Sequence, residues 1–256
     1  YMGSAQQTVT APAGSIVSSQ FSSSDIGITG NLGVGTTSPT QAIEAAGNIF
    51  INTTGNPFLE VKTSGAGNNP FIRIKADTNY WDLQTLFSNT NDELDFRYNG
   101  TSTMMIDKSG AVTKPLQPAF LTYLGSTILD IAVGTNLTVA FNNEVFDQNA
   151  DYNTSTYTFT APVTGKYQLN VLIRLNNVDT ATSYYQVYVI TSNRNYTFTF
   201  EPNFSSDVDY YNVTLANLAD MDASDTAYVR VYQNGGSQQT DLSAGGDSYF
   251  SGYLVC

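Results

Sequence analysis

Residues 157–167 read YTFTAPVTGKY, and the segment that follows stays apolar at every second position. Successive side chains of a β-strand point to opposite faces, so Tyr167 and Leu169 share one face of a strand, and Phe159 lies on one face of the strand before it. Between the two, an Ala-Pro pair and a glycine supply the residue types of a tight corner. The stretch predicts two strands joined by a turn, each with one face in a sandwich core.

Similar short runs of apolar and aromatic residues recur through the C-terminal half, separated by polar loops. No segment has the periodicity of a long helix. This many short strands in about 140 residues predict a β-sandwich or jelly roll. The expected strands are Ala119–Leu124, Leu137–Phe141, Tyr157–Thr160, Gly165–Leu175, Tyr184–Ile190, Tyr196–Phe200, Tyr210–Leu215, Ala227–Tyr232 and Tyr249–Leu254.

The preceding part also predicts short strands, with turn residues such as Asn99-Gly100 between them. In one run, Phe71, Arg73 and Lys75 alternate with two isoleucines, so one face of this strand is exposed to solvent and the core is thin. We expect another chain to complete its burial. Residues 40–46 are expected to form a short helical turn. The expected strands are Ile49–Ile51, Phe58–Val61, Phe71–Ile74, Trp81–Leu86, Leu94–Phe96 and Met104–Ile106.

Composition divides the chain into three parts. Residues 1–39 are rich in Ser, Thr, Gln, Gly and Ala, and their few hydrophobes alternate with glycine. This connector is either a ladder shared between several chains or a flexible linker. Residues 40–114 are the β-rich module, and prolines at 115 and 118 predict an extended break before the sandwich, residues 115–256.

The chain of 256 residues carries 10 Lys and Arg against 22 Asp and Glu, a formal net charge of −12. Nucleic acids and anionic membranes both attract basic surfaces, so we expect neither partner. No stretch approaches the roughly 18 apolar residues of a membrane span. Histidine is missing and Cys256 is the single cysteine, which excludes histidine catalysis and an intrachain disulfide. A sequence that begins at Tyr1 rather than Met is consistent with a segment of a longer polypeptide.

Three stretches resemble the jelly roll of the complement C1q and tumour-necrosis-factor-like family: residues 141–147 with Tyr152, residues 157–167, and the closing residues 247–254. Tyr157 departs from the pattern, because the family often has glycine there. The resemblance implies a homotrimer with an aromatic-lined threefold axis. The residues that it suggests for this contact are Tyr188, Tyr249 and Tyr253.

A second resemblance is to bacteriophage tail fibres and related trimeric adhesins. Residues 30–39, GNLGVGTTSP, are similar to a segment near the start of a fibre shaft module, and residues 106–115 followed by 117–120 are similar to a junction between shaft and tip. The resemblance implies an extended trimeric β shaft, other virion proteins on its N-terminal side, and a location in the virion, outside the host cell.

Two polar segments with tyrosines, residues 178–185 and 203–211, have the composition of recognition loops. Variable connectors without a ligand are the alternative. Trp81 beside Tyr80 is either a carbohydrate platform or, by our preference, a core residue. The candidate ligand-binding residues are Asp179, Tyr184, Tyr185, Asn203, Asp207, Asp209 and Tyr210.

Clustered carboxylates are the only abundant groups capable of chemistry. They lie at residues 92–95, 207–209 and 220–225, and paired carboxylates serve glycosidases or bind calcium. None has the spacing of a calcium loop, and acidic pairs in polar loops are usually solvated. We expect no catalytic residues and no cofactor, and leave calcium near the tip as an open alternative.

These observations predict an all-β chain with an extended trimeric shaft followed by a C1q/TNF-like jelly roll. The expected function is that of a structural and adhesive component of a phage fibre, whose tip attaches to a glycan or protein of the host surface. The alternatives are a polysaccharide depolymerase that uses paired carboxylates and a capsid decoration fibre without a receptor role.

Overall fold

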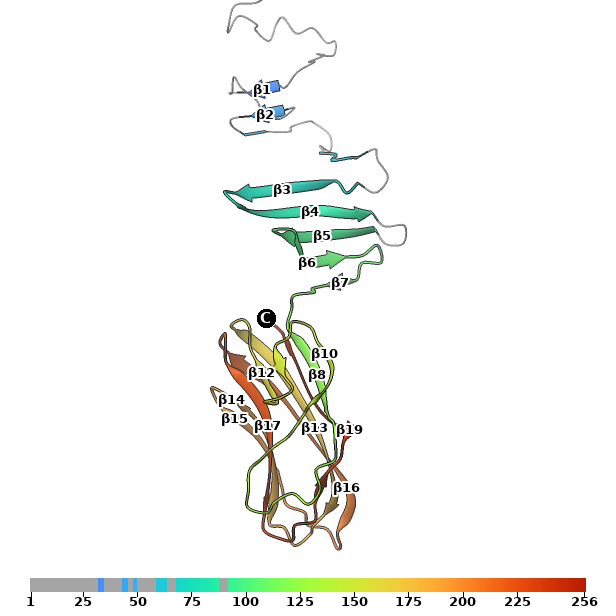
Figure 1. The fold of residues 1–256 in the computed structure, drawn as a ribbon, viewed down its shortest axis with the longest axis vertical. Coiled ribbons are helices and arrows are strands. Elements are labelled where there is room, and N and C mark those ends of the chain that lie inside the picture. The colour runs from blue at the N-terminus through green and yellow to red at the C-terminus, as the bar shows by residue number, and fades with distance from the viewer. Residues whose placement is uncertain (1–31, 35–42, 46–47, 50–58, 64–67, 88–91) are drawn as a thin grey trace, which may run out of the picture. The chain divides into compact units, whose positions relative to one another are not determined.

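The structure is a computed structural model that describes residues 32–34, 43–45, 48–49, 59–63, 68–87 and 92–256. The chain divides into two compact units, residues 1–60 and 61–256. Every regular element within the described ranges is a β-strand (Figure 1), which confirms the all-β prediction. No helix in these ranges is long and apolar enough to cross a membrane.

The first unit contains one described pair of strands. Strand β1 (Leu32–Val34) runs parallel to β2 (Ile43–Ala45), with Leu32 opposite Ile43. The predicted helical turn over residues 40–46 is wrong for its described residues, because residues 43–45 are extended in this ladder. Most of the predicted connector lies outside the described residues.

An antiparallel meander of five strands follows, each paired with the next. Asn99 and Gly100 have φ of 46° and 85° and form the tight turn that their types predict. The strand predicted at 58–61 is wrong for residues 59–61, and Ile49 is also outside any strand. The strands are β3 (Phe71–Ala76), β4 (Asn79–Phe87), β5 (Asp92–Tyr98), β6 (Thr101–Ile106) and β7 (Val112–Thr113).

The remaining strands form two sheets in a jelly-roll arrangement. The first has the order β10-β8-β19-β13-β16, with β18 beside β13, and the second has the order β11-β12-β17-β14-β15, with β9 beside β17. The strands are β8 (Ala119–Leu124), β9 (Leu137–Thr138), β10 (Asn143–Asp147), β11 (Tyr152–Asn153), β12 (Thr158–Thr160), β13 (Gly165–Val178), β14 (Tyr184–Thr191), β15 (Asn195–Phe200), β16 (Val208–Met221), β17 (Thr226–Asn234), β18 (Asp241–Leu242) and β19 (Gly245–Leu254).

The core of the sandwich contains the residues that the even spacing predicts. Phe159, Tyr167 and Leu169 are fully buried, and the Phe159 ring stacks on Phe120 with centroids 4.8 Å apart. Tyr157 has a φ of 59°, the left-handed conformation that glycine adopts freely. The tyrosine therefore keeps the backbone turn that glycine often provides in the family.

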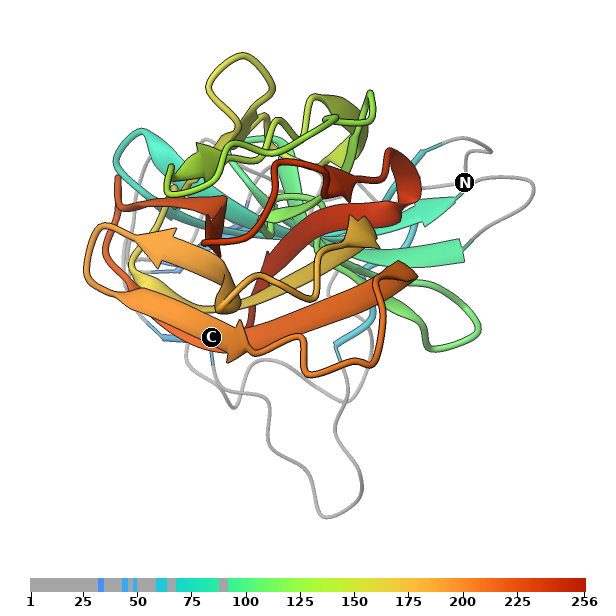
Figure 2. The same cartoon turned by 90° about the horizontal axis from the view of Figure 1, so that it is seen from below.

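The chain enters and leaves the sandwich at the same end. The Leu254 N–H donates to the Pro118 carbonyl at 3.1 Å, and Gln117 Nε2 donates to the Leu254 carbonyl at 2.6 Å. The predicted break around Pro118 falls between β7 and β8. The loops that join β13 to β14, β15 to β16 and β17 to β18 lie at the opposite end, which faces the viewer in Figure 2.

Candidate functional site

Asp207 ties together the three loops at the far end of the sandwich. Its Oδ1 accepts hydrogen bonds from the Thr180 N–H at 2.9 Å and the Thr180 Oγ1 at 2.8 Å, and its Oδ2 accepts one from Gln239 Nε2 at 2.8 Å. These bonds, the one from the Thr180 backbone first, lower the pKa of Asp207 because they stabilise its charged form. The carboxylate is exposed, but its oxygens already hold the loops in place.

Two of the predicted ligand residues are buried, which corrects their assignment. Asp179 Oδ1 accepts a hydrogen bond from the Ala181 N–H at 2.7 Å, and its Oδ2 accepts one from the Ser237 N–H. Tyr185 has no exposed surface, and its hydroxyl lies 2.7 Å from Thr240 Oγ1. Both side chains organise the loops from inside and are out of reach of a ligand.

The other predicted ligand residues lie on the surface. Asn203 is exposed in the loop between β15 and β16, and Asp209 and Tyr210 are exposed at the start of β16. The Arg174 guanidinium stacks over the Tyr210 ring at 4.2 Å from its centroid, and the ring still has 63% of its surface exposed. Tyr184 is half-buried on β14 and belongs to another surface, described below. The far end of the sandwich therefore presents the exposed ring of Tyr210, which the Arg174 guanidinium supports by stacking.

The outer side of the first sheet carries a group of apolar residues among polar ones such as Gln168 and Asn170. Tyr249 lies between Tyr123 and Leu172 in the ladder, and Tyr253 lies between Ala119 and Gln168. Phe146 and Leu218 were not predicted, because the side a strand residue faces depends on a register that the sequence does not show. The apolar outer face consists of Leu121, Tyr123, Phe146, Leu172, Leu218, Tyr249 and Tyr253, of which Phe146, Leu218 and Tyr253 are 48%, 57% and 49% exposed.

The second sheet has an outer side of different character. The Arg230 guanidinium stacks over the Tyr188 ring at 4.4 Å, and the Tyr184 and Tyr232 ring centroids are 6.2 Å apart. Tyr188, a predicted trimer contact, is therefore on the opposite sheet from Tyr249 and Tyr253. All three contribute to one interface only if the first sheet of one copy meets the second sheet of its neighbour, as rotational symmetry allows.

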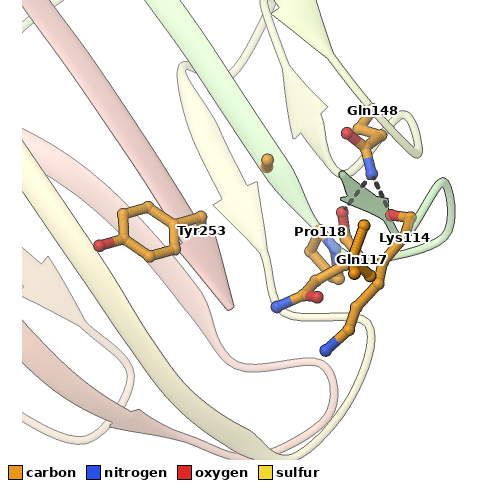
Figure 3. Close-up of a pocket in the computed structure, with 7 residues that line it drawn as sticks. Lys114, Gln117, Pro118, Gln148 and Tyr253 are labelled. Atoms are coloured by element: carbon orange, nitrogen blue, oxygen red, sulfur yellow. Dashed lines mark hydrogen bonds between the residues drawn. The ribbon is translucent and has the colours of Figure 1, made fainter. Parts of the chain in front are cut away.

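A pocket of about 430 Å³ lies where the chain enters the sandwich (Figure 3). Gln148 Nε2 donates to the carbonyls of Lys114 and Gln117, at 2.8 Å each, and Tyr253 lines another side. Gln148 gave no signal in the sequence, because its partners are backbone groups more than thirty residues away. The hydrogen bonds from Gln148 hold the segment that joins β7 to β8.

At least one carboxylate in each acidic cluster is engaged in a hydrogen bond or ion pair. Asp220 pairs with Lys166, which lowers the pKa of Asp220, and Asp225 Oδ2 accepts a hydrogen bond from Asn193 Nδ2 at 2.7 Å. Asp95 is fully buried and accepts one from Ser102 Oγ at 2.8 Å. Across the residues that the structure describes, no group of three or more acidic or sulfur ligands is placed to hold a metal ion.

Comparison with protein families gives a match to the C1q domain over residues 126–255. The chain belongs to the C1q domain family. The match covers every strand of the sandwich except β8, so the loop end and most of the apolar outer face are parts of a C1q domain. The comparison with curated proteins gives no match.

Three solved structures are similar to part of the chain. The globular domain of zebrafish complement 1qA is 17% identical, covers 55% of this chain and 98% of its own, and has a TM-score of 0.41. Murine APRIL is 13% identical, with coverage of 54% and 99% and a TM-score of 0.39. Eiger TNF from S. frugiperda is 13% identical, with coverage of 55% and 93% and a TM-score of 0.40.

Proposed function

We propose that the chain is the homotrimeric end of a bacteriophage fibre and that its C1q domain attaches the virion to a glycan or protein of the host surface. The observation that carries the proposal is the uncovered apolar outer face. Three of its side chains are about half exposed in the single chain, and large apolar side chains gathered on one face mark interaction sites. A trimer would cover it with the neighbouring copies.

The attachment role follows from the geometry of the far end. Tyr210 lies near the loops remote from the point where the chain enters the domain, and Asp207 fixes these loops. Aromatic rings and amide groups on a rigid framework suit hydrogen bonding and stacking with a glycan or protein. Three copies would present three such sites, so a weak single site gives a strong attachment.

The fibre context rests on the sequence resemblance of residues 30–39 and 106–120. On this proposal, the N-terminal side joins other virion proteins and the C1q domain is the part furthest from the particle. The chemistry is adhesion, because bonds within the domain already engage the carboxylates of Asp207 and Asp225.

The trimer is tested on the full chain with Leu218→Glu, which places a charge on the apolar outer face. We expect light scattering to give three times the chain mass for the parent and a lower mass for the variant. Leu129→Glu is the matched control, since Leu129 is 68% exposed outside that face. A parent of one chain mass would contradict the trimer.

Attachment is tested with the fluorescently labelled full chain on a panel of intact bacteria. We expect binding to some strains and its loss in Tyr210→Ala, which should keep the mass of the parent. A trimer that binds none of the strains would favour the capsid decoration fibre. Release of reducing sugar ends from capsular polysaccharide would favour the depolymerase.

A further inference from the structure

The five-stranded sheet of β3 to β7 has one face with three adjacent rows of uncharged side chains. The ladder places Ile72 opposite Leu83 and Ile74 opposite Trp81, and side chains across neighbouring strands form rows. These three rows hold no charged residue, although the chain has a net charge of −12. Asp92 lies on the same side of the sheet beyond them, at the start of β5. This uncharged face consists of Ile72, Leu83, Phe96 and Met104; Ile74, Trp81, Tyr98 and Thr101; and Thr85, Leu94, Ile106 and Val112.

The other face of the same sheet is polar, and its charged pair of Arg73 and Asp82 is formed within the chain. Arg73 donates from Nε and Nη2 to the two oxygens of Asp82, at 2.8 Å each, and its guanidinium stacks over Tyr80 at 3.9 Å. The hydrogen bond from Arg73 lowers the pKa of Asp82. This ion pair needs no partner chain to be stable in water.

The uncharged face is open in the single chain. Ile74 is 73% exposed, Trp81 48% and Val112 55%. Together the face leaves on the order of 600 Å² of side-chain surface in water, while a stable interface buries roughly 800 Å² per partner. A monomeric protein seldom leaves so large an apolar patch uncovered.

We infer that the uncharged faces of several copies of this chain pack against one another around a common axis, as an assembly interface separate from the C1q domain. The inference rests on the proposed homotrimer and adds a second contact to it. Between chains of net charge −12, close approach is least opposed where neither surface carries charge. Symmetry then brings an identical uncharged surface to each copy.

Trp81 is the single tryptophan of the chain and belongs to this face, so it reports directly on the interface. The experiment uses the full chain across a dilution series, with the mass from light scattering and acrylamide quenching of Trp81 measured on the same samples. We expect the mass of three copies, blue-shifted emission and quenching several-fold weaker than in the guanidinium-unfolded chain. The mass of the assembly and the protection of Trp81 from acrylamide should fall together on dilution.

Two variants test the face itself. Ile74→Glu should raise the quenching of Trp81 several-fold. Thr113→Glu, which adds the same single negative charge on the polar face, should leave the quenching unchanged. Ile74 is largely exposed in the single chain, so its replacement should not unfold the sheet, which circular dichroism checks. Val112→Glu, at the other edge of the face, should repeat the effect of Ile74→Glu.

The outcomes separate this inference from the proposed trimer. A mass of three copies with freely quenched Trp81 overturns the inference and leaves the C1q trimer intact. A single chain with freely quenched Trp81, or a mass of two copies, overturns both. A single chain with protected Trp81 also overturns both, because part of the same chain then covers the face.

Discussion

At the scale of the residue, Asp207 shows how one side chain organises a surface. Its oxygens accept hydrogen bonds from Thr180 and Gln239, which belong to two other loops. Each of these bonds favours the charged carboxylate, so the folded state holds the proton less tightly than the unfolded chain does. The stability of the loop end is therefore linked to pH through this group.

Asp207→Asn should lower the melting temperature near neutral pH, since an amide nitrogen cannot accept the bonds that the carboxylate accepts. The folded pKa of Asp207 is lowered, so its contribution is complete above the unfolded value of about 3.9 and is lost as pH falls through the folded value. The difference between variant and parent should thus shrink in acid. Thermal melts over a pH series measure it, with the exposed Asp209→Asn as control. A difference that persists in strong acid would show that the charge is not its source.

The composition of the loops identified the residue types at this site. It did not show which of these residues are buried and which are exposed. Tyr184 and Tyr185 are adjacent in the sequence, yet the first is half-buried on the outer side of β14 and the second is sealed in the core. Asp179 and Asp207 look alike in sequence, and only the fold shows that one is buried between loops. Such distinctions depend on strand register, which is set by partners far along the chain.

At the scale of the element, the last strand, β19, completes the first sheet between β8 and β13. Gly252 is buried in it, and a Cβ there would lie 2.7 Å from Leu169 Cδ2 and 2.7 Å from Phe120 Cε1. These distances are too short for carbon atoms in contact, so a larger residue must displace core side chains. The closing strand therefore needs glycine for its close approach to the core.

Gly252→Ala should lower the free energy of unfolding by about 1–3 kcal/mol, the usual cost of overpacking a core. Urea denaturation at a fixed protein concentration measures the change. Gly246→Ala in the same strand is the control, because no atom lies within 4 Å of its added Cβ, and it should change stability by less than about 0.5 kcal/mol. Equal effects of the two substitutions would contradict the packing argument.

Long strands were predictable and short ones were not. Alternation predicted β8 with its observed bounds and most of β13 and β14, because one buried face imposes a period of two. Strands β11 and β18 have two residues each and are defined only by their ladder partners. The exposure of Ile72 and Ile74 agrees with the thin core that the sequence predicted, although the sequence shows two faces of the strand but not what covers them.

At the scale of the whole molecule, charge opposes any assembly of identical copies. Each chain has a formal net charge of −12, and the uncharged rows of β3 to β7 and the apolar outer face offer the contacts that can outweigh the repulsion. The chain has 10 Lys and Arg, so few cations are present to form ion pairs between copies. Three of them, Arg73, Lys166 and Arg174, already form ion pairs within the chain. Repulsion between copies should therefore be the main electrostatic effect.

Added salt should tighten the assembly of the full chain. The Debye length falls from about 30 Å at 0.01 M to about 10 Å at 0.1 M, so most of the repulsion between copies should be screened over this range. The concentration at which the assembly dissociates, followed by light scattering on dilution, should decrease as sodium chloride rises and level off once screening is complete. Levelling off separates screening from a general strengthening of apolar contacts, which would continue to higher salt. An assembly that loosens as salt is added would mean that ion pairs between copies hold it together, and the uncharged faces would then not be its main contact.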